Sequence, residues 1–600
     1  MSQLFRSFLP LHNPIGFGAS DFIELELAVL LVLLVAAQAG LGGRARRLAA
    51  HTRWCMLALA ILPIALRLAM LAHSPVPTPN GSDEFSHLLA ADTLRQFRLA
   101  NPTHPLHRFF ETIFVLQEPT DSSIFPLGQG IALALGRMIF RYPWAGVLLS
   151  VAAMSALCYW MLLAWTTPGW ALVGGLLTVI QFGPLRYWMN TYWGGAVSAV
   201  AGCLVFGSLP RLRANWRTRD AILLGLGIGM QLLTRPFECL LMMAAAAVFF
   251  LPSLRGPQQW SKLARVTVAL ALSVLPAAGL TLFQNKQVTG SWTTLPYMLS
   301  RYQYGVPTTF TIQPNPVPHR ELTPSQQLDY EEQAATHGND TDTFRGYVER
   351  LAARARFYRF FFLPPLYLAL PFFLPSLRQW RFAWVALALA AFSLGANFYP
   401  YFYPHYIAAA TCLFVLVSVI GLERLSGVTI RGTAAGREAA QLLVLVCAAQ
   451  FLFWYGFHLF ANTNASLAML QYDAWDDVNH GDPEGRIAVH DRLAQAARKQ
   501  LVFVRYWPQH RFKEWIQNAA NIDTAAVVWA LDRGAAENDK LRRYYPDRTV
   551  WLLEPDARPP KMSPYQQEPP PEPPAPEIHQ EPREKPSPVM NGIQLLPVPQ

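Results

Sequence analysis

The stretch WAGVLLSVAAMSALCYWMLLAW, residues 144–165, contains no Asp, Glu, Lys or Arg. As a helix rising about 1.5 Å per residue, it is long enough to cross the roughly 30 Å apolar core of a bilayer. Similar runs recur along the 600 residues, of which 52% are hydrophobic and 15% charged, against roughly 25% charged in a typical soluble domain. The mean hydropathy is +0.19. The sequence therefore predicts a polytopic membrane protein and excludes an ordinary cytosolic enzyme or a fibrous chain.

About twelve apolar segments are predicted to cross the membrane, which gives an all-α polytopic bundle over residues 1–460. The segments begin near Phe22, Trp54, Trp144, Pro168, Trp193, Asp220, Phe237, Val266, Tyr358, Phe382, His405 and Gln441. A further apolar run, 127–140, is short and is interrupted by Arg137. We expect it to form a helix that lies along the outer surface.

The net charge of +10 is concentrated in short loops between the apolar segments. Arginine and lysine gather in the loops 44–53, 211–219, 255–265, 378–381 and 424–437. The positive-inside rule places these loops in the cytoplasm and explains the charge without a nucleic-acid partner. We therefore expect a bacterial cytoplasmic (inner) membrane protein. Its periplasmic loops 73–142 and 284–357 and its C-terminus then lie outside the cytoplasm.

The composition changes after the last apolar segment. Residues 465–555 are predicted to form a small soluble α/β module, because 501–505, 525–530 and 549–553 have the pattern of short buried strands. No glycine-rich phosphate loop accompanies them, so nucleotide binding is not predicted. The proline-rich tail 556–600 is predicted to be extended and disordered.

The cysteines give no sign of a metal site or of disulfides. All six lie in or beside apolar segments, without a CxxC pair, and are expected to be small core residues: Cys55, Cys158, Cys203, Cys239, Cys412 and Cys447. The N-terminus lacks a short apolar region followed by a small-residue cleavage site, so no cleaved signal peptide is expected.

The strongest candidate for chemistry is the segment NGSDEFSH, residues 80–87, in the first outer loop. A helix that begins at Ser82 places Glu84 and His87 on one face and directs Asp83 elsewhere. One carboxylate can then face a substrate while the other holds it in place. Adjacent carboxylates also suit the first turn of a surface helix that Ser82 or Asp83 caps. Both interpretations remain open on the sequence.

Cations and aromatic residues occur in the other outward-facing segments. The substrate contacts predicted besides His87 are Arg186, Tyr187, Trp188, Arg235, Lys286 and His405. The segment 183–195 (GPLRYWMNTYWGG) provides either a stacking wall for a sugar or an isoprenoid, or an interfacial aromatic belt. Arg235 either binds an anion or forms an ion pair with Glu238. His405 equally suits the start of a helix.

A divalent metal site is a further hypothesis for the first outer loop. The potential ligands there are His87, His104, His107, Glu111, Glu118 and Asp121. Their spacing matches no standard zinc pattern. The sequence therefore leaves a divalent metal open and requires no cofactor.

Taken together, these features resemble the GT-C superfamily of integral-membrane glycosyltransferases, above all bacterial members related to protein O-mannosyltransferases and lipid A aminoarabinose transferases. The resemblance rests on Asp83-Glu84 in the first large outward loop. The many apolar segments, the long 284–357 loop and the soluble C-terminal part support it. It covers roughly residues 54–460, with one additional basic-flanked span before the acidic loop.

The resemblance implies an inverting transfer of a hexosyl or pentosyl group from a polyprenyl-phosphate sugar donor. The acceptor is a hydroxyl of a lipid, glycan or protein, reached among membrane lipids. Asp83 then acts as the general base or orients the acceptor, and Glu84 is its partner. An alternative is a transporter or flippase of a lipid-linked saccharide. It requires polar residues along the spans, where Arg67 is one of few charges. A non-catalytic scaffold is a third possibility.

Overall fold

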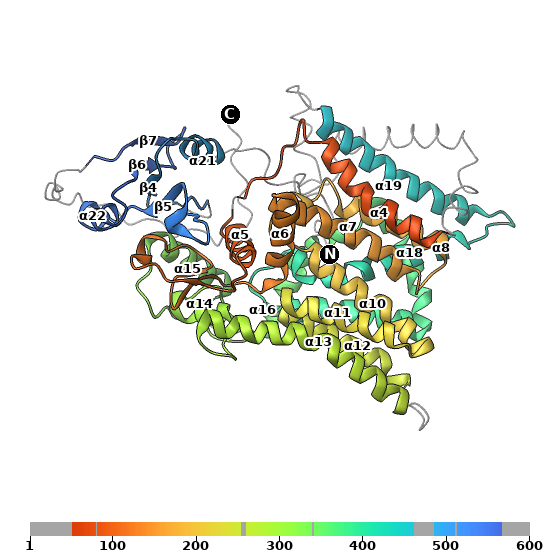
Figure 1. Cartoon of the computed structure of the whole chain (residues 1–600). Coiled ribbons are helices and arrows are strands. Elements are labelled where there is room, and N and C mark those ends of the chain that lie inside the picture. The colour runs from red at the N-terminus through yellow and green to blue at the C-terminus, as the bar shows by residue number, and fades with distance from the viewer. Residues whose placement is uncertain are drawn as a thin grey trace.

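The computed structural model describes residues 51–79, 81–253, 260–338, 341–460, 485–510 and 513–566. The predicted span near Phe22 and the predicted disordered tail beyond residue 566 lie outside these ranges. Figure 1 shows a bundle of long helices and, at one end of it, an assembly of shorter helices and two small sheets.

Six helices among the described residues are long and apolar enough to cross a membrane. They are α4 (Thr52–Ala69), α7 (Pro143–Leu162), α10 (Ala196–Asn215), α13 (Trp260–Thr289), η7 with α18 (Pro404–Ala410 and Thr411–Ser426) and α19 (Ala435–Phe460). The bundle also contains α6 (Leu127–Phe140), α8 (Pro168–Phe182), α11 (Thr218–Thr234), α12 (Pro236–Phe250), η2 (Leu251–Ser253) and α17 (Trp380–Ala396). By the length and apolarity of its helices, the chain is a multi-pass membrane protein.

The segment that begins near Tyr358 is not the regular helix that we predicted. It forms three successive 3-10 helices, η4 (Ala355–Phe361), η5 (Pro364–Leu368) and η6 (Leu370–Arg378). The segment contains Pro364, Pro365, Pro371 and Pro375. Each proline lacks the N–H that an α-helix requires and clashes with the preceding turn, so the chain cannot continue as one α-helix.

The short apolar run 127–140 forms α6, which packs against α7 through two glycines. A Cβ atom on Gly146 would collide with the carbonyl group of Ala132, and one on Gly136 would collide with the backbone of Gly146. Small residues allow this close backbone approach. Arg137 of α6 forms an ion pair with Asp92 at 3.2 Å. α6 thereby connects the bundle to the helix that carries the acidic segment.

The two long loops of the chain form one assembly. The first contains α5 (Ser82–Arg95), η1 (His107–Phe109) and an antiparallel sheet in the order β1 (Asn101–Pro102), β3 (Thr120–Ser123), β2 (Val115–Leu116). The second contains α14 (Pro296–Tyr304), α15 (Pro324–His337) and α16 (Phe344–Arg354). Arg108 pairs with Glu321 at 2.8 Å, and Arg320 pairs with Glu111 at 2.9 Å. These ion pairs join the loops across more than 200 residues of sequence.

The C-terminal module is a mixed sheet in the order β5-β4-β6-β7, with β4 (Gln500–Val504), β5 (Val527–Leu531), β6 (Thr549–Glu554) and β7 (Lys561–Pro564). β4 is parallel to β5 and to β6, and β7 is antiparallel to β6. Helices α21 (Arg486–Ala494) and α22 (Ala535–Tyr544) and the short η8 (Ile522–Thr524) complete it. We placed residues 561–564 in the disordered tail, which is wrong because β7 pairs Met562 with Leu553.

The module packs directly on the first of these two loops. The Asp92 carboxylate of α5 accepts a hydrogen bond from the backbone N–H of Ala520 at 2.9 Å. The guanidinium of Arg486 lies 4.6 Å from the ring centre of Phe85. Phe109 and Phe110 of the loop belong to the same apolar cluster as Leu501 and Phe503 of the module. Both loops and the module therefore lie at one end of the bundle (Figure 1).

Candidate active site

Helix α5 begins at Ser82, as the sequence predicted, but its N-terminus is capped in another way. Gly81 is the N-cap residue, and its backbone N–H donates to the Oε2 atom of Glu84 at 3.1 Å. Neither Ser82 nor Asp83 is the capping residue. The side chain of Asp83 is consequently not used to terminate the helix.

Glu84 connects α5 to the segment 183–195. Its side chain is fully buried, and its Oε1 atom accepts a hydrogen bond from the backbone N–H of Tyr192 at 2.9 Å. The Tyr192 hydroxyl in turn donates to the carbonyl of Pro77 at 3.0 Å. With both carboxylate oxygens bound to backbone N–H groups, Glu84 positions the acidic segment instead of facing a substrate.

We expect Glu84→Gln to destabilise the fold. A glutamine can place its single carbonyl oxygen against one N–H, and its amide group then meets the other N–H donor. A buried donor without a partner costs about 1–3 kcal/mol. Denaturant unfolding of the protein in detergent measures this loss. The matched control is Glu331→Gln on α15, whose exposed side chain accepts from Gln327 at 2.8 Å. Equal stability of the two variants would contradict the positioning role.

Asp83 is partly buried beside this structural carboxylate. Burial first, and then the charge of Glu84, raise the pKa of Asp83 to about 7, while the charge of Arg235 acts in the opposite direction. Asp83 belongs to α5, and Arg235 lies between α11 and α12. The fold therefore brings a carboxyl group that titrates near neutral pH close to an arginine that is distant in the sequence. A group with such a pKa is suited to general base catalysis.

Arg235 forms the ion pair with Glu238, which is one of the two roles that the sequence left open. Its Nη1 atom lies 3.6 Å from the Oε1 atom of Glu238, and its guanidinium lies 4.5 Å from the ring centre of Tyr406. The separation from Glu238 exceeds the roughly 2.7–2.9 Å of a close charge-assisted hydrogen bond. The Arg235 side chain also retains 24% exposure. It is thus held by an aromatic face and a loose ion pair, and it remains accessible to an anion.

Two histidines and a tyrosine lie next to this pair. The His87 ring stacks on Phe125 at 4.5 Å, and its Nδ1 atom has no hydrogen-bond partner among the described residues. Burial and the charge of Arg235 lower the pKa of His87 to about 3, so this ring is neutral. His405 lies with its Nδ1 atom 3.1 Å from the Tyr187 hydroxyl. The fold thus brings together most of the predicted residues.

Three of the residues predicted to contact the substrate are instead engaged with other parts of the protein. Trp188 is fully buried and stacks on Phe182 at 5.5 Å, so the predicted stacking wall is wrong for this residue. Glu84 contacts the same segment through the backbone N–H of Tyr192. Arg186 is also buried, and its Nε atom donates to the carbonyl of Gln181 at 3.1 Å. Lys286 donates to the carbonyl of Gly290 at 2.7 Å, at the C-terminal end of α13.

The histidines of the first long loop do not form the metal site that we considered. Within the described ranges, no three His, Cys, Asp or Glu side chains come together as metal ligands. His104 lies 3.4 Å from Asp523 of the module, and His107 lies 3.6 Å from Glu118. Glu111 pairs with Arg320. These residues instead join the loops to each other and to the module.

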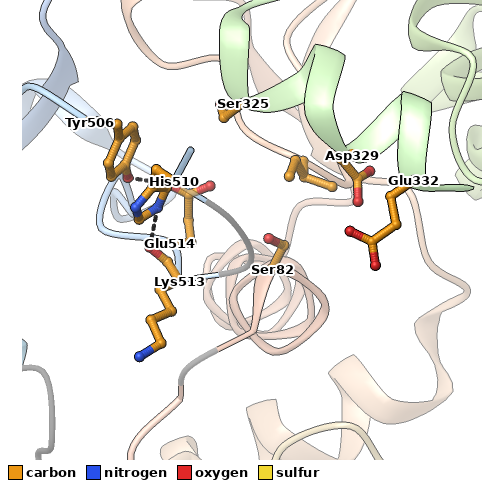
Figure 2. Close-up of a pocket in the computed structure, with 9 residues that line it drawn as sticks. Ser82, Ser325, Asp329, Glu332, Tyr506, His510, Lys513 and Glu514 are labelled. Carbon is orange, nitrogen blue, oxygen red and sulfur yellow. Dashed lines mark hydrogen bonds between the residues drawn. The ribbon is translucent and has the colours of Figure 1, made fainter. Parts of the chain in front are cut away.

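Two acidic residues of α15, Asp329 and Glu332, lie near Asp83 and were not predicted from the sequence. Burial first, and then the charge of Asp83, raise the pKa of Asp329 to about 7. Glu332 and Asp83 both contribute, after burial, to a raised pKa of Tyr403. The available signal was an acidic pair at i, i+3 in a loop predicted to lie on the same side as Asp83. No motif marks these residues, so only the tertiary structure, which brings Asp329 and Glu332 around one pocket with Ser82 of α5 (Figure 2), reveals them.

The fold and the site together define a multi-pass membrane protein with an acid–base and cationic site at one end of its bundle. No protein-family model and no curated protein matches the sequence. The structure is similar to that of ArnT from Cupriavidus metallidurans, solved in the apo state and bound to undecaprenyl phosphate. The identity is 11% and the TM-score 0.47, over 82% of this chain and 92% of that chain.

A second similar structure is the archaeal oligosaccharyltransferase AglB from Archaeoglobus fulgidus, solved in complex with an inhibitory peptide and a dolichol-phosphate. The identity is 11% and the TM-score 0.39, over 84% of this chain and 69% of that chain.

Proposed function

We propose that this protein is a glycosyltransferase of the GT-C type. It transfers a sugar from a polyprenyl-phosphate donor to an acceptor hydroxyl, at the outer face of the cytoplasmic membrane. The observation that carries the proposal is the pair of Asp83 and Arg235, a near-neutral base and an accessible cation, held together from distant segments. Attack on an activated sugar carbon and neutralisation of a phosphate leaving group require these two functions.

The reaction follows from the positions of these groups. Asp83 in its ionised form accepts the proton of the acceptor hydroxyl, whose oxygen forms a bond to the anomeric carbon of the donor. The bond from that carbon to the phosphate oxygen breaks on the opposite face, which inverts the configuration. Arg235 neutralises the negative charge that the departing polyprenyl phosphate gains. Glu84 keeps α5 against the segment 183–195 throughout.

The packing of the outer parts supports the predicted orientation in the membrane. The 284–357 loop packs in one assembly with the first long loop, and the module packs on that first loop. The 284–357 loop and the module therefore lie on the same side of the membrane, so an even number of crossings must separate them. α17, α18 and α19 supply three, so the 3-10 segment 355–378 supplies the fourth.

Two of the basic loops, 211–219 and 378–381, meet at another group of aromatic side chains. Arg213 lies over the Phe249 ring and Arg381 over the Phe382 ring, and Trp165 contacts both rings. This clustering supports a cytoplasmic end that is rich in arginine. We expect a topology reporter fused after Phe460 to be active only outside the cytoplasm. A reporter fused within 211–219 is the control and should be active only inside. Activity of the first fusion in the cytoplasm would contradict the orientation.

The transporter alternative requires polar side chains along the spans, and Arg67, one of the few charges there, does not support it. Arg67 is fully buried and fully engaged, because its Nε atom donates to Asn190 at 2.7 Å and its Nη1 atom to the carbonyl of Ser74 at 2.8 Å. It also lies 4.9 Å from the ring centre of Trp144. Arg67 thus fixes the outer end of α4 and does not line a route across the membrane.

The proposed function is tested by mass spectrometry of lipids and glycans from cells with and without this protein. We expect at least one lipid, glycan or protein to carry a sugar only when the protein is present. Purified protein with a labelled polyprenyl-phosphate sugar should then transfer the label to that acceptor. Identical profiles in both kinds of cell, together with no turnover of the labelled donor, would overturn the proposal.

A further inference from the structure

An open groove lies where the two long loops of the chain meet, outside the site described above. It has a volume of about 440 Å³ and is lined by Arg108, Glu118, Tyr302, Gln303, His319, Arg320 and Glu321. Arg108 and Glu118 come from the loop that also carries Asp83, and the other residues come from the 284–357 loop. None of the reaction steps above uses these residues. The volume lies in the range of pockets that bind small molecules.

One wall of the groove is an aromatic platform. The ring of Tyr302, near the C-terminal end of α14, is stacked on the ring of His319, with the ring centres 4.1 Å apart and the planes at 15°. Tyr302 is nevertheless 59% exposed, so much of its ring remains open to solvent on the side that His319 does not cover. Large aromatic rings contribute most when they are buried, and one that is left exposed in a groove is a natural contact surface for a ligand.

Hydrogen bonds to the backbone hold this platform in place. The backbone N–H of His319 donates to the carbonyl of Tyr302 at 3.1 Å, and the Nδ1 atom of the His319 ring lies 2.8 Å from the same carbonyl. The backbone N–H of Arg320 donates to the carbonyl of Gln303 at 3.1 Å. Residues 319–320 are therefore fixed against the end of α14. Because the platform is preformed, a ligand does not have to order it on binding.

The other walls of the groove consist of charged side chains that neutralise one another. Arg108 pairs with Glu321 at 2.8 Å, and Arg320 pairs with Glu118 at 2.8 Å. The buried carboxylate of Glu111 lies behind both arginines, 3.0 Å from Arg108 and 2.9 Å from Arg320. The lining of the groove thus holds two arginines and two glutamates. A strongly charged ligand of either sign would meet a repelling side chain for each attracting one.

The two glutamates keep acceptor positions for a ligand. A carboxylate accepts about four hydrogen bonds, and the side chains of Glu118 and Glu321 remain 47% and 85% exposed. Gln303 donates from its side-chain amide to the carbonyl of Glu118 at 2.9 Å, and its Oε1 atom has no hydrogen-bond partner among the described residues. The groove therefore combines planar polar groups with one exposed aromatic face.

We propose that this groove binds an uncharged saccharide, with the open face of Tyr302 stacked on the face of a pyranose ring. A pyranose ring carries C–H bonds on its faces and hydroxyl groups around its edge. The C–H bonds suit an aromatic face, and the hydroxyl groups suit the carboxylates and guanidinium groups beside it. A phosphate lacks the apolar face, and a lipid chain lacks the hydroxyl groups. The saccharide is part of the acceptor, an assignment that rests on the proposed function, whereas the binding itself stands on the groove.

The probes are the disaccharides chitobiose, cellobiose and maltose, and sorbitol is their counterpart because it has the hydroxyl groups without a ring. Binding to the full-length protein, in a detergent without a sugar headgroup, is followed by saturation-transfer NMR. We expect at least one disaccharide to bind, with the strongest saturation on its ring C–H protons, and to bind more tightly than sorbitol. Its affinity should hardly change between about 0.05 M and about 0.5 M salt, because the contacts are uncharged on the ligand side. Failure of all three disaccharides to bind better than sorbitol would overturn the proposal, and so would a steep loss of binding with salt.

Matched variants locate the binding. Tyr302→Ala should weaken disaccharide binding about tenfold, the size of one aromatic stacking contact, whereas Tyr302→Phe keeps the ring and should retain the affinity. Phe344→Ala is the control, because it removes another exposed aromatic ring of the same loop that does not line the groove. Equal affinity of Tyr302→Ala and Phe344→Ala would overturn the assignment. Tyr302→Leu, which fills the volume without an aromatic face, replaces Tyr302→Ala if that variant fails to fold.

The groove and the enzyme can be refuted separately. In the transfer reaction, Tyr302→Ala should raise the acceptor concentration needed for half-maximal rate more than that of the lipid-linked donor. Disaccharide binding in a protein that transfers no sugar would refute only the enzyme. Sugar transfer by a protein that binds no disaccharide would refute only the groove.

Discussion

Replacing Asp83 with Asn will lower the rate of sugar transfer by about 10²–10⁴-fold, the usual effect of losing a general base. Asparagine fits the same volume and leaves the two hydrogen bonds of Glu84 intact, so the bundle should remain folded. Turnover of a labelled polyprenyl-phosphate sugar by the purified variant measures the loss. Asp83→Glu is the control, because it keeps the acid and should retain more activity than Asp83→Asn.

The pH profile of the wild type separates a base from a merely structural aspartate. Because the pKa of Asp83 is raised to about 7, the ionised base is scarce below that pH. The rate should therefore rise about tenfold per pH unit towards pH 7 and level off above it. The residual rate of Asp83→Asn should lack this rise. A variant with unchanged turnover at all pH values would refute the catalytic role.

The same substitution should increase stability. The folded Asp83 keeps its proton up to about pH 7, whereas its unperturbed pKa is 3.8. Ionisation therefore destabilises the folded state progressively between these values, and the penalty is complete above pH 7. Asp83→Asn removes it, so the variant should melt at a higher temperature than wild type at about pH 8. The difference should be smaller at about pH 5. A residue retained at a cost in stability is typical of a functional site.

The sequence predicts the helices of the bundle well where a long apolar run is sufficient to determine the helix. α7 and α13 follow from long runs without clustered charge, since a segment in lipid must satisfy its own backbone. The stretch 355–378 shows the limit of this signal. It is equally apolar, yet its prolines prevent an α-helix, and a hydropathy pattern does not distinguish the two conformations.

The site is predicted only where its residues are neighbours in the sequence. The start of α5 at Ser82 follows from local spacing, and with it the separate directions of Asp83 and Glu84. Trp188 was misassigned because a polar, aromatic segment at a span end does not reveal whether it turns inward. Asp329 was missed because only the tertiary packing of the long second loop places it beside α5.

Arg235→Ala will raise the concentration of lipid-linked donor needed for half-maximal rate far more than that of the acceptor, and will lower transfer by about 10²–10³-fold. The guanidinium is the group positioned to bind phosphate, because Tyr406 holds its face and Glu238 lies at a loose 3.6 Å. Arg235→Lys should recover part of the loss, since lysine keeps the charge and loses the planar fork of donors.

The decisive comparison is with Glu238→Gln. If Arg235 serves only as the partner of Glu238, both substitutions should reduce stability and turnover alike, and donor and acceptor should suffer equally. If Arg235 binds the phosphate, Glu238→Gln frees the guanidinium from its ion pair and should leave donor affinity equal or tighter. Titration of each variant with a labelled polyprenyl-phosphate sugar measures this directly. Since Arg235 also opposes the raised pKa of Asp83, Arg235→Ala should in addition shift the rise of the pH profile to higher pH. Loss of donor binding and that shift, appearing together in one variant, are not expected of a simple structural ion pair.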